Sequence, residues 1–359
     1  MKRNVFWAAH YIFADYDWLT LDDRIYCVLR TIQPICYPIL AIVAVPVNLV
    51  TIAILSRGKC GLSKGVTRYL VSMASSDLLV VILDLILRQI PIAFPREFRL
   101  LRSIPACNVH AVLLYAATDC SVWFTVTFTF DRCVAICSAK LRSKYCSVRT
   151  AAVVLGTVSV LSCLKNVFWY FLLRGWYYLL NNPWFCYGRK NVLYSPVWAT
   201  IEFLHYLVTP VLPFLLVLVL NALTIRHVLV ASRARKRLRG SSSGEQSPRD
   251  PEMDNRRKSL VLLLVISGNF ISLWALFTVY YVWARLRYLG SVSTFPPWTV
   301  RELGFMLQLL SCCTNTAIYA ATQRKFREQL KEAVKPPRAF LVECARCVRR
   351  LRNPRQCPD

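Results

Sequence analysis

Seven long apolar stretches constrain this chain more than any other feature of its sequence. They cover about residues 35–55, 70–90, 107–137, 151–173, 197–225, 260–284 and 300–321. A helix needs about 20 consecutive apolar residues to cross a hydrocarbon layer about 30 Å thick. The stretches are continuous and lack the alternating pattern of a membrane barrel. Because lipid cannot satisfy backbone hydrogen bonds, we expect an all-α membrane protein, a bundle of seven transmembrane helices.

The charge balance of the chain indicates how such a bundle is oriented. The 359 residues are 56% hydrophobic, and 45 Lys and Arg stand against 19 Asp and Glu, a formal net charge of +26. This charge alone would suit a nucleic-acid binder, but the high hydrophobic content does not, so we expect no nucleic-acid partner. Of the 45 basic residues, 29 follow the first, third, fifth and seventh stretches. The positive-inside rule therefore places these segments in the cytoplasm and the N-terminus outside the cell.

The predicted spans divide the chain into four parts. These are an extracellular N-terminus (1–34), a transmembrane domain (35–321), an amphipathic helix (322–334) and a basic cytoplasmic tail (335–359). The amphipathic helix has Phe326 and Leu330 on one face, which is typical of a helix that lies on the membrane surface. In the tail, Cys344, Cys347 and Cys357 stand among basic residues. They are candidates for S-palmitoylation beside anionic lipid, with unmodified cysteine as the alternative.

Polar side chains inside the spans are the first candidates for function, because a charge in lipid is costly. Asp77 lies in the middle of the second span, and Asp131 and Arg132 close the third. The seventh span carries the sequence Asn-Thr-Ala-Ile-Tyr near its inner end, from Asn315 to Tyr319. No grouping of nucleophile, base or metal ligands accompanies them, so we do not expect an enzyme.

At these positions the chain resembles the class A (rhodopsin-like) G-protein-coupled receptors, over about residues 35–330. The stretch Asp131-Arg132-Cys133 is similar to the Asp-Arg-Tyr motif of that family, and Asn315 to Tyr319 is similar to its Asn-Pro-x-x-Tyr motif. Four further positions match motif residues of the family. They are Asn48 in the first span, Asp77 in the second, Pro213 in the fifth and Trp274 in the sixth.

The resemblance implies a receptor at the cell membrane that binds a small extracellular ligand and activates a heterotrimeric G protein. Within the family, the stretches 123–132 and 319–327 look most like the orphan branch that responds to aromatic amino acids. That branch implies an amino acid or a short peptide as ligand and a q-type G protein. Asp131 would hold Arg132 at rest, and Arg132 would contact the G protein after activation. A simple salt bridge at the helix end is the alternative.

The resemblance also implies a disulfide and an allosteric sodium ion, but no other cofactor. Cys107 and Cys186 would form the disulfide between the third span and the second extracellular loop, with two unpaired thiols as the alternative. Hard oxygen ligands on facing helices suit sodium, and a hydrated polar network without an ion is the alternative. The implied sodium ligands are Asp77, Ser121, Ser311 and Asn315.

A ligand pocket is expected between the third, fifth, sixth and seventh spans on the extracellular side. Leu114 stands where amine receptors carry their ammonium-binding aspartate, so we do not expect a monoamine held in that way. Acids and bases together could grip a zwitterion such as an amino acid. In the alternative, Asp119 pairs with Lys165 or His205 and touches no ligand. The candidate ligand-binding residues are Asp84, Arg88, Leu114, Tyr115, Thr118, Asp119, Glu202, His205, Phe277, Tyr281 and Gln308.

Two departures from the family pattern concern the helix movements expected on activation rather than the fold. Leu276 replaces the helix-six proline and Thr316 the helix-seven proline, so we expect a weaker kink in helix six. A receptor-like protein with impaired or absent G-protein coupling is therefore the alternative function. A transporter is less favoured, because the sequence shows no duplicated halves with matching Gly or Pro interruptions.

Overall fold

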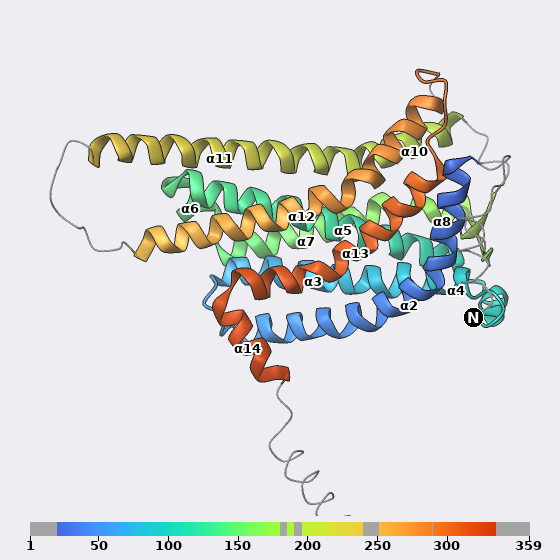
Figure 1. The fold of residues 1–359 in the computed structure, drawn as a ribbon, viewed down its shortest axis with the longest axis horizontal. Coiled ribbons are helices and arrows are strands. Elements are labelled where there is room, and N and C mark those ends of the chain that lie inside the picture. The colour runs from blue at the N-terminus through green and yellow to red at the C-terminus, as the bar shows by residue number, and fades with distance from the viewer. Residues whose placement is uncertain (1–19, 180–184, 190–195, 240–250, 289, 335–359) are drawn as a thin grey trace, which may run out of the picture.

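The computed structural model describes residues 20–179, 185–189, 196–239, 251–288 and 290–334. In this part, seven helices are long and apolar enough to cross a membrane. They lie side by side along the long axis of the molecule (Figure 1). The predicted all-α bundle of seven transmembrane helices is confirmed.

Several spans combine more than one helical segment. The second span joins α3, the π-helical η1 and α4, the fourth joins α7 and α8, and the fifth joins α10, the π-helical η3 and α11. The spans are α2 (Leu21–Ser56), α3 (Lys64–Val80), η1 (Val81–Gln89), α4 (Ile90–Ala93), α5 (Cys107–Cys137), α7 (Val148–Asn166), α8 (Phe168–Leu172), α10 (Pro196–Tyr206), η3 (Leu207–Val211), α11 (Leu212–Arg239), α12 (Pro251–Tyr288) and α13 (Trp298–Thr322). The connecting elements are η2 (Arg99–Ser103), α6 (Ala139–Tyr145), β1 (Leu173–Tyr177) and β2 (Cys186–Gly188), and α14 (Arg324–Val334) follows the last span.

The first helix begins well before the predicted span. It starts at Leu21, so residues 21–34, assigned above to an extracellular N-terminus, are helical. Thr20 and Asp23 form a capping box, in which each side chain accepts a hydrogen bond from the other residue's backbone N–H. Farther along, Gln33 donates to the Glu302 carboxylate of α13 over 2.6 Å. The apolar stretch alone misses this extension because its first turns are charged.

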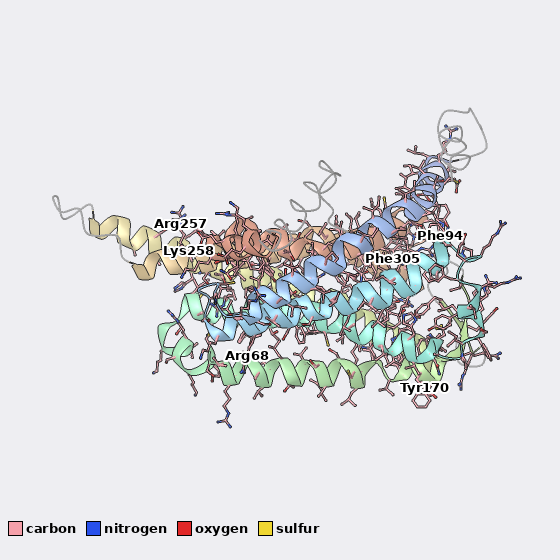
Figure 2. All side chains as sticks on the ribbon, turned by 90° about the horizontal axis from the view of Figure 1, so that it is seen from below. Arg68, Phe94, Tyr170, Arg257, Lys258 and Phe305 are labelled. Atoms are coloured by element: carbon pink, nitrogen blue, oxygen red, sulfur yellow. A yellow bond between two sulfur atoms is a disulfide. The ribbon has the colours of Figure 1, made fainter. Side chains whose placement is uncertain are left out.

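The two ends of the bundle differ in composition. At one end, here called the hairpin end, β1 and β2 pair antiparallel, and Cys186 of β2 forms a disulfide with Cys107 at the start of α5. The predicted disulfide is thus present. At the other end, here called the basic end, lie α6, α14, the end of α11 and the start of α12 (Figure 1). Figure 2 places Arg68, Arg257 and Lys258 at the basic end.

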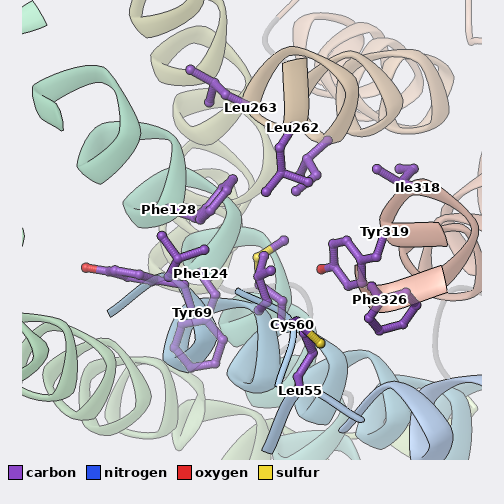
Figure 3. Packing of buried hydrophobic residues seen from close by; sticks show 14 of the residues in the cluster. Leu55, Cys60, Tyr69, Phe124, Phe128, Leu262, Leu263, Ile318, Tyr319 and Phe326 are labelled. Carbon is purple, nitrogen blue, oxygen red and sulfur yellow. The ribbon is translucent and has the colours of Figure 1, made fainter. Parts of the chain in front are cut away.

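A cluster of buried apolar side chains fills the basic half of the bundle. Phe128 of α5 is completely buried among side chains of α3, α12 and α13 (Figure 3). Tyr319 of α13 and Phe326 of α14 meet edge to face, with ring centroids 5.8 Å apart. This contact docks α14, the predicted amphipathic helix, whose basic residues Arg324 and Arg327 stay exposed. Because lipid is as apolar as these side chains, the cluster stabilises the fold through close packing.

We expect Phe128→Ala to destabilise the protein and Phe130→Ala to leave it nearly unchanged. Phe128 is 0% exposed, whereas Phe130 lies on the same helix and is 55% exposed. Removing the Phe128 ring leaves a void of roughly 90 Å³, which at about 24 cal/mol per Å³ costs about 2 kcal/mol. Thermal unfolding of the purified variants in detergent measures the difference, and equal losses would contradict the packing described here.

Candidate functional site

Asp77 is the polar centre of the bundle. It is 2% exposed and lies on α3. Ser121 of α5 donates to its Oδ1 over 2.6 Å, and Asn315 of α13 donates to its Oδ2 over 2.6 Å. One carboxylate thus joins three helices through charge-assisted hydrogen bonds, which are stronger than neutral ones.

A small cavity of about 20 Å³ adjoins Asp77. Its walls include Ser121, Ser311, Asn315 and Trp274, and Trp274 donates to the Ser311 hydroxyl over 3.2 Å. Of the described residues that line it, none is basic, so Asp77 has no cation beside it there. A space of 10–15 Å³ holds one water-sized particle, and hard oxygen donors suit sodium. The residues present therefore fit a sodium ion, with Asp77 as the compensating charge.

Arg132 lies at the basic end of α5. Its Nε donates to the Asp131 carboxylate over 3.0 Å, and a second nitrogen of the guanidinium pairs with the same oxygen. Its remaining terminal nitrogen donates to Ser259 of α12 over 3.4 Å. Arg132 therefore contacts both its neighbour Asp131 and helix six. It makes a further contact beyond the simple salt bridge at the helix end that was the alternative.

A cavity of about 390 Å³ opens beside Arg132. Arg142 and Lys258 also line it, and the described residues of its wall include no acid. Cys146 stands in this wall and donates to the Asp131 carbonyl over 3.4 Å. Burial, together with the Asp131 carboxylate, raises the pKa of the Cys146 thiol to about 11, so the thiol stays protonated at neutral pH. The cavity is basic and suits an acidic partner segment.

The two family prolines that this chain lacks are replaced by unbroken helix. α12 runs through Leu276 and α13 through Thr316 without interruption. The Thr316 hydroxyl lies 2.5 Å from that of Thr51 on α2 and also faces the Val47 carbonyl at 3.3 Å. Hydroxyl contacts between helices therefore take the place of a proline kink here.

A third cavity lies in the hairpin half of the bundle. Its volume of about 40 Å³ leaves room for about three water molecules. The predicted ligand-binding residues come together in its wall, with the exception of Glu202. The lining residues are Asp84, Arg88, Leu114, Tyr115, Thr118, Asp119, His205, Tyr206, Thr209, Trp274, Phe277, Tyr281, Phe305 and Gln308.

Charges at this cavity are paired within the protein. Arg88 and Asp84 form an ion pair of 2.6 Å one helical turn apart, and the Arg88 guanidinium lies over the Phe305 ring at 5.4 Å. In contrast, His205 Nδ1 and Gln308 Oε1 are buried, and no described residue hydrogen-bonds to either atom. Buried polar atoms without a protein partner indicate water or a ligand at that position.

Glu202 does not line the cavity, contrary to the prediction. It forms a bidentate ion pair with Arg285 of α12, with distances of 2.5 and 2.8 Å. Arg285 in turn lies over the Tyr206 ring at 4.8 Å. The pair ties α10 to α12 at the hairpin end. Arg285 lies one residue beyond the predicted sixth span, so the sequence analysis did not consider it as a partner.

Asp119 follows the alternative in which it pairs internally. Lys165 of α7 lies 2.8 Å from its carboxylate, and Asn166 donates to the same oxygen over 2.6 Å. Lys165 also donates to Thr209 over 3.1 Å. His205 makes no ion pair with Asp119 but meets the Tyr115 ring edge to face at 5.5 Å. Asp119 still borders the cavity, so a ligand there would meet a neutralised pair.

Three lining residues were missed by the sequence analysis. Tyr206 and Thr209 line the cavity beside the predicted His205, and Thr209 lies one helical turn after His205 on the same face. Phe305 lines it from α13. Pro210 signals an irregular helix, but not which side chains then face inward. The predicted lipidation residues Cys344 and Cys347 lie outside the described residues.

Comparison with known proteins gives a consistent result. Residues 47–319 match the family model described as 7 transmembrane receptor (rhodopsin family). A mouse protein named probable G-protein coupled receptor 142 is 24% identical over 330 residues, which cover 89% of this chain and 78% of that protein. Residues 47–319 include every lining residue of the three cavities described above except Gln323 of the basic cavity.

Breaking the Asp119–Lys165 pair on one side should destabilise the bundle strongly. Lys165→Met leaves a buried carboxylate without its cation, which costs about 3–5 kcal/mol. The double variant Asp119→Asn with Lys165→Met removes both charges and should recover most of that loss. Chemical unfolding in detergent measures both. A double variant no more stable than Lys165→Met would contradict a direct pairing of the two charges.

The Thr51–Thr316 contact should appear as an energetic coupling between α2 and α13. Thr51→Val and Thr316→Val each remove one hydroxyl, and the double variant removes both. Hydrogen bonds between membrane helices average about 0.6 kcal/mol in such cycles. We therefore expect a coupling of about that size in the free energy of unfolding. Strictly additive losses would show that the hydroxyls do not interact.

Proposed function

Since the chain belongs to the rhodopsin family of seven-transmembrane receptors, we propose that it binds a small extracellular ligand and activates a heterotrimeric G protein. One observation carries the proposal: Arg132 faces a basic cavity while its side chain contacts both Asp131 and Ser259 of helix six. The name of the mouse relative also supports coupling to a G protein.

The proposal includes an orientation in the cell membrane. The basic end faces the cytoplasm and the hairpin end faces outside, as the positive-inside rule predicts. The disulfide between Cys107 and Cys186 at the hairpin end supports this orientation, because disulfides persist in an oxidising exterior. The N-terminus is then extracellular and the basic cavity faces the cytosol.

Coupling begins when Arg132 leaves its resting contacts. At rest, Asp131 neutralises the guanidinium and Ser259 joins it to α12. If α12 moves outward, the Ser259 contact is lost and the basic cavity widens. The guanidinium, with its several donors, can then bind carbonyl or carboxylate groups of a G-protein segment. The family resemblance alone suggests a q-type G protein.

The ligand is proposed to be a zwitterion of amino-acid size, or a short peptide, that enters the cavity in the hairpin half. The cavity of about 40 Å³ is smaller than such a ligand, so its walls must move apart when the ligand binds. The Asp84–Arg88 pair offers one acid and one base, and His205 and Gln308 offer buried polar atoms without a protein partner. Tyr115, Phe277, Tyr281 and Phe305 supply aromatic walls. The resemblance to the orphan branch that responds to aromatic amino acids supports the same class of ligand.

A receptor-like protein with impaired coupling is the second candidate. It is favoured by the unbroken course of α12 through Leu276 and of α13 through Thr316, since kinks commonly arise at prolines. The Thr51–Thr316 contact adds a hydrogen bond that must break if α13 moves relative to α2.

Arg132→Ala distinguishes the two candidates. In cells that express the chain, we expect the variant to lower the second-messenger output, basal or evoked by a panel of amino acids and peptides, to background. Arg149→Ala is the matched control, because Arg149 is exposed at the same end and does not line the cavity. An output that is equal for Arg132→Ala and the intact chain would reject coupling through Arg132. A chain with no output of any kind would favour the second candidate.

Sodium should stabilise the purified protein through Asp77. Binding to the folded state alone at ten times the dissociation constant adds about 1.4 kcal/mol. We expect a higher melting temperature in sodium chloride than in choline chloride at equal ionic strength. Asp77→Asn should abolish this difference, whereas Glu328→Gln, an exposed acid on α14, should preserve it. Equal melting temperatures for the intact chain in both salts would argue against the ion.

A further inference from the structure

We propose that a groove at the basic end of the bundle binds one anionic phospholipid, with its phosphate beside Lys64 and Arg68 and an acyl chain against α7. The groove has a volume of about 650 Å³. The end of α2, the turn after it, the start of α3 and the start of α7 form its walls. The basic cavity beside Arg132 lies on the other side of the turn after α2 and reaches α5, α6 and α12. Leu62 is the one described residue that lines both.

The polar end of the groove carries two positive charges. Lys64 and Arg68 lie one helical turn apart on α3, both exposed, so their side chains are neighbours. Arg68 donates from one terminal nitrogen to the Val148 carbonyl over 2.9 Å, which holds the guanidinium at the wall formed by α7. Figure 2 shows Arg68 beside this helix.

No internal acid compensates these two charges. Within the described residues, no Asp or Glu lines the groove, and neither cation takes part in an ion pair. Like charges one turn apart on a helix repel each other. A phosphate between them would relieve this repulsion and would accept hydrogen bonds from both side chains.

The remainder of the groove is apolar and lies at the lipid-facing side of the bundle. Leu55 and Leu155 are buried at its base, while the small Ala152 leaves its outer wall open. Neighbouring apolar side chains of α7 point outward, among them Val153, which is 61% exposed. An apolar slot that begins beneath two cations matches a phospholipid, which has an acyl chain below its phosphate. A free phosphate would leave the slot empty, and a neutral lipid would leave the cations unpaired.

Native mass spectrometry of the purified full-length chain tests the proposal. The detergent-solubilised protein is mixed with equal amounts of phosphatidylglycerol and phosphatidylcholine, and the retained lipid is counted. We expect preferential retention of one phosphatidylglycerol, and Lys64→Gln with Arg68→Gln should weaken it about tenfold or more, since each cation contributes about a factor of five. Lys140→Gln with Lys144→Gln removes the same charge from α6, at the same end but outside the groove, and should have little effect.

A second pair of variants tests the apolar slot while both cations remain. Ala152→Trp places a large side chain in the groove and should abolish retention, whereas Val153→Trp places it on the neighbouring lipid-facing position and should not. An excess of inorganic phosphate should not displace the lipid. Equal retention by all variants would overturn the proposal in favour of general attraction of lipid to a basic surface. Displacement by inorganic phosphate, or equal retention of the two lipids, would also overturn it. None of these outcomes depends on G-protein coupling.

Discussion

The hydrogen bonds of Asp77 to Ser121 and Asn315 cross the centre of the bundle and link α3, α5 and α13. Lipid offers these groups neither a donor nor water, so the polar side chains must find their partners within the protein. Apolar surfaces do not impose this requirement, because lipid tails solvate them as well as another helix does. Polar contacts therefore select which helices are neighbours, and apolar packing such as that around Phe128 then fills the space between them.

The same requirement links the two halves of the bundle. Trp274 lines both the cavity beside Asp77 and the cavity in the hairpin half, and it donates to Ser311 of α13. In the proposed function, a ligand that displaces Trp274 changes the surroundings of Asp77 directly. At the basic end, Arg132 depends on Ser259 of the same helix α12. Helix α12 thus contributes side chains to the ligand cavity, to the cavity beside Asp77 and to the basic cavity.

How far the sequence predicts these features depends on the range of the interactions behind them. The existence of the spans depends on local composition, and Cys107 and Cys186 are identified by their position in a known pattern. The start of α2 is different, because its charged first turn is held by a distant contact, in which the Thr299 hydroxyl of α13 donates to the Asp22 carbonyl. The pairing of Glu202 with Arg285 is equally non-local, since it joins α10 and α12 over 83 positions.

Helical periodicity accounts for part of the remaining difference at the ligand cavity. A regular helix places one face at every third or fourth residue. His205, Tyr206 and Thr209 have this spacing and all border the cavity, so Tyr206 and Thr209 could have been predicted from their distance to His205. The replacement of proline by Thr316 is visible in the sequence, but its contact with Thr51 is not, because it depends on how α13 lies against α2.

We propose that contacts across the bundle hold the basic end closed and that G-protein binding opens it. The distance between probes placed on α6 and α12, at the positions of Lys144 and Lys258, measures this directly. Electron spin resonance on genetically encoded labels avoids the native cysteines. We expect a purified heterotrimeric G protein to lengthen this distance, and nucleotide, which releases the G protein, to restore it. A distance that stays the same with the G protein bound would show that the basic end does not open by movement of α12 away from α6.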